Sequence, residues 1–270
     1  MIPLRRVVLG IVGGIALAYA IILPALYFSQ RSLVFPAPPR FPDLPEGFGP
    51  VRLKTADGLE LAGAYRPPQP GRPVLVFFHG NGDSWAGAAL ATKGLAAAGY
   101  GVLAPEYRGY GTNPGSPSEA GLYADGRAAL DWLDGHGVRP EQTVLVGNSL
   151  GSGVATQLAS ERPVGALMLV SPFTSVPDVA AEKFWWLPVR WLARDRFDNA
   201  AKIARVRAPV LVMQGLADSV IPPAQAERLA AARQGTDYLA VPGADHDLAY
   251  WPAAQAQQLD WLQQALARRR

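Results

Sequence analysis

The 270-residue chain contains no cysteine and only three histidines, and charged residues make up only 17% of it. Without cysteine, it has no disulfide framework, no thiolate nucleophile and no cysteine-ligated metal. The formal net charge is +3 and the basic residues are scattered, so no basic stripe marks the chain as a nucleic-acid binder. There is also no Walker sequence, no His/Glu metal spacing and no G-x-G-x-x-G after a first strand. The sequence therefore implies no metal and no organic cofactor.

Hydrophobic residues, in contrast, make up 49% of the chain, which is ample for the core of one large α/β domain. A hairpin turn at Ala56-Asp57-Gly58 joins two antiparallel strands, and from Pro73 onward short apolar strands alternate with helices. The predicted strands are 51–55, 59–65, 74–78, 101–104, 143–146, 166–171, 210–214 and 238–241. The predicted helices are 84–98, 118–134, 150–161, 223–234 and 249–267. This alternation predicts a mostly parallel eight-stranded sheet flanked by helices on both faces.

The N-terminal segment has the character of a membrane anchor. Residues 7–28 carry no charged side chain, and at about 1.5 Å per residue they are long enough to cross a hydrocarbon core of about 30 Å. Arg5 and Arg6 precede them, so the positive-inside rule places the N-terminus in the cytoplasm and the rest of the chain on the extracytoplasmic side. A cleaved signal peptide is the alternative, because Ala18-Tyr19-Ala20 matches a small-x-small cleavage site.

The anchor is followed by two further segments. We expect the anchor over residues 1–30, a Pro-rich extended connector over 31–50, and the α/β domain over 51–270. Within the domain, residues 172–207 break the alternation and contain Trp185, Trp186 and Trp191. Such a long connection predicts a short helical lid over the functional crevice. Alternatively, these aromatic residues pack on the sheet edge or lie at the membrane interface. Three aspartates in the lid, Asp178, Asp195 and Asp198, are interpreted as surface charges.

The motif Gly147-Asn148-Ser149-Leu150-Gly151 has the form G-x-S-x-G, which places a serine on a tight turn between a strand and a helix. An apolar strand precedes it and a helical pattern follows it. The flanking glycines let strand and helix approach closely while the serine adopts a strained backbone and points outward. Ser149 is therefore the predicted nucleophile.

A serine hydroxyl needs a base, and His246 is the candidate for this role. His246 follows the last strand, at the edge of the sheet where the carboxyl ends of the strands gather. We interpret His136 as a solvated loop residue and His79 as a structural residue that shapes a turn.

The base in turn needs a carboxylate to fix its tautomer, and Asp218 follows the strand at 210–214. The order serine, acid, histidine along the chain is the one that accompanies a G-x-S-x-G turn. Asp245 and Asp247 are weaker candidates for the acid, because side chains adjacent to a histidine seldom point back at its ring.

Two backbone amides are candidates for an oxyanion hole. The Leu150 N–H lies at the start of the helix that follows Ser149, and the Asn81 N–H lies in the turn His79-Gly80-Asn81-Gly82 after the strand at 74–78. The alternative for the second segment is a plain turn, rich in Gly and Asn for conformational reasons alone.

Together these motifs make the chain resemble the α/β-hydrolase superfamily. It is more narrowly similar to the membrane-anchored serine hydrolases with a small lid, a group that includes protein depalmitoylases of animals. The resemblance covers about residues 51–266. It rests on His79-Gly80-Asn81, Tyr107-Arg108-Gly109-Tyr110-Gly111, 147–151, Asp218, His246 and a lid-like stretch from Leu187 to Asp198. These motifs are specific for the fold and for Ser149 as nucleophile, but not for a substrate. The resemblance implies hydrolysis of an ester or thioester through an acyl-enzyme.

The sequence thus predicts a membrane-anchored serine hydrolase that acts on a small-molecule or lipid-like acyl substrate. An acyltransferase or a peptidase that uses the same three residues is the nearest alternative. A non-catalytic, membrane-tethered binding protein is the alternative from another class. The pattern predicts no oligomeric state.

Overall fold

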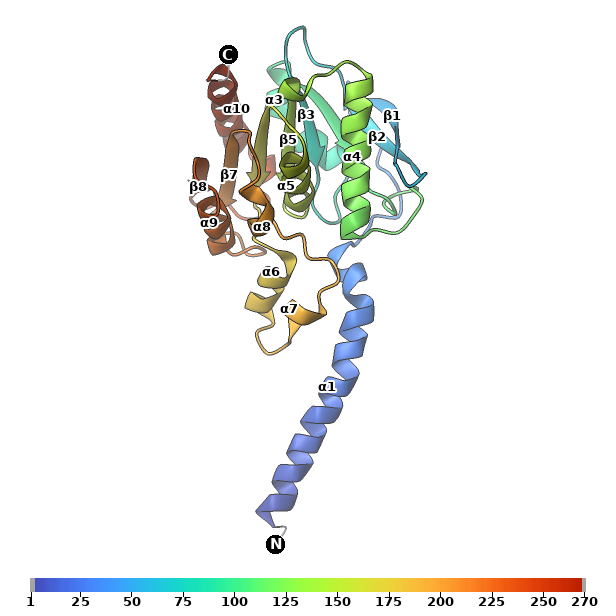
Figure 1. Ribbon diagram of the computed structural model, residues 1–270, viewed down its shortest axis with the longest axis vertical. Coiled ribbons are helices and arrows are strands. Elements are labelled where there is room, and N and C mark those ends of the chain that lie inside the picture. The colour runs from blue at the N-terminus through green and yellow to red at the C-terminus, as the bar shows by residue number, and fades with distance from the viewer. Residues whose placement is uncertain (1–2, 269–270) are drawn as a thin grey trace.

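A computed structural model describes residues 3–268 and shows one layered α/β domain from which a long N-terminal helix projects (Figure 1). The sheet consists of β1 (Gly49–Lys54), β2 (Glu60–Arg66), β3 (Val74–Phe78), β4 (Gly101–Pro105), β5 (Thr143–Asn148), β6 (Ala166–Val170), β7 (Val210–Gly215) and β8 (Thr236–Val241). The α-helices are α1 (Leu4–Val34), α2 (Trp85–Ala91), α3 (Lys93–Ala97), α4 (Glu119–Gly135), α5 (Gly151–Glu161), α6 (Val176–Lys183), α7 (Val189–Leu192), α8 (Ala200–Ile203), α9 (Pro223–Ala231) and α10 (Pro252–Ala267).

The strand order is β1-β2-β4-β3-β5-β6-β7-β8. Strand β2 pairs antiparallel with β1 and with β4, whereas every later pair is parallel. This confirms the predicted mostly parallel, eight-stranded sheet. Because the strands from β3 to β8 run parallel, their carboxyl ends meet at one edge, and the loops that follow them are brought together there.

The two faces of the sheet bury separate hydrophobic clusters. Along β3, Val74, Val76 and Phe78 contribute to one cluster, whereas Leu75 and Phe77 contribute to the other. Side chains from α4, α5 and α9 cover the first face, and side chains from α2, α3 and α10 cover the second. A central strand buried on both faces has no polar face, which explains why these strands appear in the sequence as continuous apolar runs.

Two predicted helices are divided in the structure. The helix expected at 84–98 is interrupted at Thr92, whose hydroxyl donates to the Ala88 carbonyl at 2.7 Å. The helix expected at 249–267 begins at Pro252, after a short 3₁₀ turn over Leu248–Tyr250. Proline lacks an N–H group and is tolerated in the first turn of a helix, so it sets the start of α10.

Helix α1 is 31 residues long, which at 1.5 Å per residue corresponds to about 46 Å. Its length and composition make it a candidate membrane span, and its residues are largely exposed. The helix continues to Val34, four residues past the end of the predicted anchor, and Phe35 is then buried against the domain. The segment from Pro36 to Phe48 contains no helix or strand. Residues 1, 2, 269 and 270, at the ends of the predicted anchor and of the predicted domain, lie outside the described residues.

The segment over residues 172–207, which the sequence predicts to be a lid and which is called the lid segment below, contains α6, α7 and α8. It lies at the end of the domain from which α1 emerges (Figure 1). One prediction for this segment is wrong: Asp195 is not a surface charge. Its side chain is buried and accepts two hydrogen bonds from the Arg31 guanidinium, the shorter of 2.8 Å. A carboxylate is buried at this position because a cation from α1 pairs with it.

Candidate active site

Ser149 lies on the tight turn between β5 and α5 with a φ of +51°, a left-handed conformation that is strained for a residue with a side chain. The turn is held by a 2.9 Å hydrogen bond from the Ser149 N–H to the Val170 carbonyl on β6. A Cβ added at Gly151 would overlap the Phe78 carbonyl, and one added at Gly147 would approach the Gly151 carbonyl to 2.6 Å. Only glycine therefore fits on either side of the serine.

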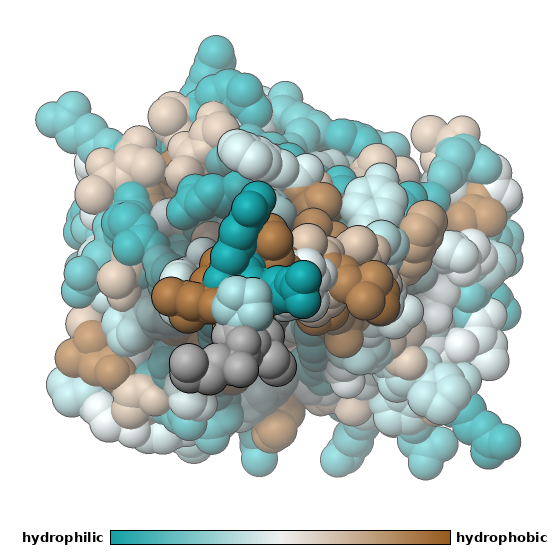
Figure 2. All heavy atoms as spheres, turned by 90° about the horizontal axis from the view of Figure 1, so that it is seen from below, coloured by the Kyte–Doolittle hydropathy of each residue, from teal (hydrophilic) through white to brown (hydrophobic). Residues whose placement is uncertain are grey.

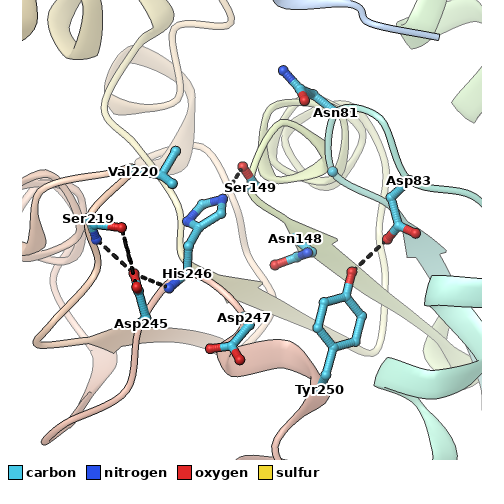
Figure 3. Close-up of a pocket in the computed structure, with 11 residues that line it drawn as sticks. Asn81, Asp83, Asn148, Ser149, Ser219, Val220, Asp245, His246, Asp247 and Tyr250 are labelled. Carbon is cyan, nitrogen blue, oxygen red and sulfur yellow. Dashed lines mark hydrogen bonds between the residues drawn. The ribbon is translucent and has the colours of Figure 1, made fainter. Parts of the chain in front are cut away.

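The three residues proposed from the sequence as nucleophile, base and acid lie in contact. His246 Nε2 is 3.0 Å from Ser149 Oγ (Figure 3), and His246 Nδ1 is 2.9 and 3.1 Å from the two carboxylate oxygens of Asp218. They come from the loops after β5, β7 and β8, which end at the same edge of the sheet. A carboxylate on one imidazole nitrogen leaves the other free to accept the serine proton.

The environment of Asp218 keeps its carboxylate ionised. Burial raises the pKa of this group. The hydrogen bond with His246 and the backbone N–H groups of Ile221 and Val220 lower the pKa by more than burial raises it, so the net shift is downward. Those two N–H groups donate to one carboxylate oxygen at 2.8 and 2.9 Å, and Gln214 Nε2 donates to the other at 3.0 Å. Asp218 is thus negatively charged and fixed in orientation beside the imidazole.

Asp245, which the sequence left as a weaker candidate for the acid, accepts hydrogen bonds from backbone N–H groups rather than from the His246 ring. Its carboxylate accepts the backbone N–H of His246 at 2.7 Å and that of Ser219 at 2.8 Å (Figure 3). These backbone bonds, that from Ser219 first, lower the pKa of Asp245. The side chain joins the loop that carries the acid to the loop that carries the base.

The two amides proposed for the oxyanion hole lie in loops that meet at Ser149. A Cβ added at Gly80 would lie 3.4 Å from the Ser149 Cβ, so the turn that carries Asn81 runs directly beside the nucleophile. Within residues 3–268, neither the Asn81 N–H nor the Leu150 N–H donates to a protein acceptor. The Asn81 side chain donates to the Val34 carbonyl at 3.2 Å.

His79, expected to shape this turn, is fully buried. Its Nδ1 lies 2.8 Å from the Gly80 carbonyl, and its Nε2 lies 3.4 Å from the carboxylate of Glu106. Burial lowers the pKa of His79, but the contacts with Glu106 oppose this, and the net shift is upward. Glu106 also accepts the N–H of Trp85 at the start of α2.

Glu106 is a residue that the sequence reasoning missed. It follows β4 directly, at the same edge of the sheet, and a carboxylate after a buried strand is the signal that identified Asp218 after β7. Through its contact with the buried His79, it supports the turn that carries Asn81.

Ser149 opens into a cavity of about 560 Å³ with a strongly acidic wall. Asp83, Asp245 and Asp247 all line it, and Asp83 accepts a 2.8 Å hydrogen bond from the Tyr250 hydroxyl (Figure 3). No Lys or Arg is among the described residues that line the cavity. In the part of the chain that the structure describes, no cluster of three or more His, Asp or Glu side chains is placed to hold a metal ion.

A mostly parallel sheet of this order, with a serine on the turn after β5 and an imidazole after β8, defines an α/β hydrolase. Comparison with known proteins agrees. A family profile described as the alpha/beta hydrolase fold matches residues 73–202. An uncharacterized protein of Mycobacterium tuberculosis is 42% identical over 249 residues, which are 88% of this chain and 88% of that protein. The chain belongs to the α/β-hydrolase superfamily, as the resemblance of its motifs implied.

Two further relatives have names of their own, and one of these names states an activity. Protein bem46 of Schizosaccharomyces pombe is 32% identical over 79% of this chain and 78% of that protein. A lysophosphatidylserine lipase of Danio rerio is 32% identical over 57% of this chain, but this match spans only 45% of the lipase. Among solved structures, an esterase of Pyrococcus furiosus superposes with a TM-score of 0.67 at 18% identity, over 85% of this chain and 97% of that one. The fold and these relatives support hydrolase activity.

Proposed function

We propose that this protein is a serine hydrolase that cleaves carboxylic ester or thioester bonds through an acyl-enzyme. Ser149 Oγ attacks the acyl carbon while His246 Nε2 takes its proton, and the amides of Asn81 and Leu150 stabilise the negative oxygen that develops. The bond to the leaving group then breaks, and His246 returns the proton to the departing oxygen or sulfur. Water, activated by the same imidazole, hydrolyses the acyl-enzyme and regenerates the serine.

The observation that carries this proposal is the continuous set of contacts from Asp218 through His246 to Ser149, with distances of 2.9 and 3.0 Å. Each contact is within the range at which a nucleophile, its base and the residue that orients the base operate together. A binding protein has no physical need for a buried carboxylate that holds an imidazole against a strained serine.

The acidic wall of the cavity bears on the leaving group. Asp83, Asp245 and Asp247 surround the space next to Ser149, and a leaving group with a negative charge would be repelled there. Because Asp247 is exposed to solvent, its contribution is screened and amounts to about 0.2–1 kcal/mol. We therefore propose that leaving groups without a negative charge are preferred.

A monoacylglycerol should accordingly be hydrolysed with a higher kcat/KM than a lysophosphatidate with the same acyl chain. In Asp247→Asn, kcat/KM for the lysophosphatidate should rise by about 1.5- to 5-fold, as expected for removal of one screened charge. Asp260→Asn on α10, which makes the same charge change outside the cavity, serves as the control. Faster hydrolysis of the anionic ester by the unaltered protein would contradict the charge argument. Failure to hydrolyse either ester, or a short p-nitrophenyl ester, would contradict the proposed function itself.

The apolar helix α1 anchors the chain to a membrane in this proposal, and the domain lies on the extracytoplasmic side. The orientation follows from Arg5 and Arg6 at the N-terminal end of the span. A reporter that is active only outside the cytoplasm, fused after residue 270, should give full signal in a bacterial host. Signal only from a reporter that requires the cytoplasm would place the domain on the opposite side.

A further inference from the structure

A second cavity, of about 420 Å³, lies between α1 and the lid segment. Its walls are almost entirely apolar. From α1 it is lined by Ile22, Leu26, Tyr27, Gln30, Leu33 and Val34, and from the lid segment by Val176, Pro177, Ala180, Phe184, Trp186, Leu187, Val189, Leu192, Ala193 and Asp195. We call this cavity the anchor groove. None of the residues that line it also lines the cavity next to Ser149.

The depth of the anchor groove follows from where the lid segment meets α1. The Tyr19 hydroxyl donates to the Trp186 carbonyl at 2.5 Å, and the two rings pack edge to face. A span of about 30 Å requires about 20 residues, so a hydrocarbon core that begins at Arg6 reaches about Leu26. Tyr19 lies seven residues, or about 10 Å, inside that boundary. The end of the lid segment near Trp186 is therefore immersed in the near leaflet.

The side chains of the lid segment agree with that depth. Trp185 is 83% exposed and Trp191 is 90% exposed, and Phe184 is 47% exposed. Large aromatic side chains that protrude together are unfavourable in water but are suited to the boundary between lipid and water. Viewed along α1, hydrophobic residues lie beside the helix on the face of the domain from which it emerges (Figure 2).

Polar contacts along one edge of the groove join its two walls. Arg31 pairs with the buried carboxylate of Asp195 at 2.8 Å, and Gln30 bonds the Leu192 carbonyl at 3.2 Å and the Arg194 N–H at 2.8 Å. These bonds fix the lid segment to α1, so that the apolar walls face each other as a preformed site.

The inner end of the groove lies beside the proposed oxyanion loop. Leu33 and Val34 line this end, and the Val34 carbonyl accepts the 3.2 Å hydrogen bond from the side chain of Asn81. Asn81 in turn lines the catalytic cavity together with Ser149. From Ile22 to Val34 the groove follows thirteen residues of α1, which span about 18 Å. One end therefore lies at the depth of the leaflet, and the other lies beside the loop that carries Asn81.

We propose that the anchor groove binds an acyl chain of a bilayer lipid and directs the ester of that lipid toward Ser149. A chain that moves from the leaflet into the groove exchanges one apolar environment for another, while the ester and the head group reach the polar cavity. The binding of the chain rests on the groove alone. Its role in delivering a substrate rests on the proposed function.

The test uses full-length protein with Ser149→Ala, which preserves the lipid, in phosphatidylcholine vesicles. The vesicles contain a trace of phosphatidylcholine with a diazirine in the middle of one acyl chain. After irradiation, peptide fragmentation should locate the lipid adduct on residues that line the groove, such as Val176 and Val189, and not only on the exposed Trp185 and Trp191. Because a bulkier side chain fills the groove, Ala180→Trp should lower these adducts by at least about fivefold. Adducts on the lipid-facing Val12 and Ile15 should remain. Leu26→Trp, on the opposite wall, should act in the same way, and Leu90→Trp on α2 serves as the control.

Adducts confined to exposed residues such as Val12, Ile15, Trp185 and Trp191, or adducts in the groove that neither variant reduces, would overturn this inference. A cross-link between these residues of two copies, made with a separate bifunctional photoreagent, would show that a second helix occupies the groove and would also overturn it. Fluorophosphonate labelling of the unaltered serine separates the two proposals. Labelled Ser149 without lipid adducts in the groove leaves the hydrolase proposal standing. Groove adducts without labelling leave only the lipid site.

Discussion

Ser149→Ala should lower kcat/KM for p-nitrophenyl butyrate by about 10⁴- to 10⁶-fold, the range found when a hydrolase loses its nucleophile. The hydroxyl that would form the acyl-enzyme is removed, whereas the oxyanion amides and the cavity remain. Alanine keeps the Cβ that serine already places at a φ of +51°, so the turn is no more strained than before. The melting temperature should therefore stay close to that of the unaltered protein.

Ser160→Ala is the matched control. Ser160 lies on the same helix, α5, and its hydroxyl bonds only the Gln157 carbonyl, at 2.7 Å. This variant should retain nearly full activity. If Ser149→Ala kept more than about a hundredth of the original activity, the acyl-enzyme route through Ser149 would be wrong, because a base and an oxyanion hole without a nucleophile do not supply that rate.

Asp218→Asn should lower kcat by about 10⁴-fold with little change in the shape of the site, as expected when the partner of the imidazole loses its charge. An amide beside His246 Nδ1 can donate a hydrogen bond, which favours the tautomer with its proton on Nε2. That nitrogen then faces Ser149 Oγ, 3.0 Å away, as a donor and cannot accept the serine proton. Asp260→Asn again serves as the control, and kcat measured over a range of pH is the readout. Activity within tenfold of the original would contradict the role of Asp218.

The stabilities of the unaltered protein and of Asp218→Asn, compared at several pH values, test the electrostatics of the site. In the folded protein the pKa of Asp218 is below its ordinary value, so ionisation of this group favours the folded state. Its contribution is present above the unfolded pKa of about 3.9 and is lost as the pH falls through the lower folded value. The difference in unfolding free energy between the protein and Asp218→Asn should therefore shrink below about pH 4. A difference that grows toward acid would mean that the carboxylate is protonated when folded.

The sequence was sufficient for the sheet because its central strands are short, apolar and separated by turns. Val74 to Phe78 was found at its observed place, the strand predicted at 143–146 ends two residues before the end of β5, and the run into Gly147 identified the serine turn. The positions of Asp218 and His246 followed from strand ends, because parallel strands bring their carboxyl ends to one edge. The break of the second helix at Thr92 left no comparable signal.

Features that depend on contacts between distant segments were beyond a single sequence. Glu106 supports the turn that carries Asn81 only because β4 lies beside β3, and the strand order is not visible in the chain. Asp195 looked like a surface charge because its partner, Arg31, lies 164 residues away on α1. The anchor groove could not be predicted from the sequence for the same reason, since one of its walls comes from α1 and the other comes from the lid segment.

The central claim is that Asp218, His246 and Ser149 act as one proton relay, and reaction with a fluorophosphonate tests it most directly. Intact-protein and peptide mass spectrometry of the folded chain should show one adduct, on Ser149, and His246→Ala should slow its formation by at least about 10³-fold. The account is contradicted if Ser149 stays unmodified while the protein is folded, or if Ser149→Ala or His246→Ala reacts as fast as the unaltered protein.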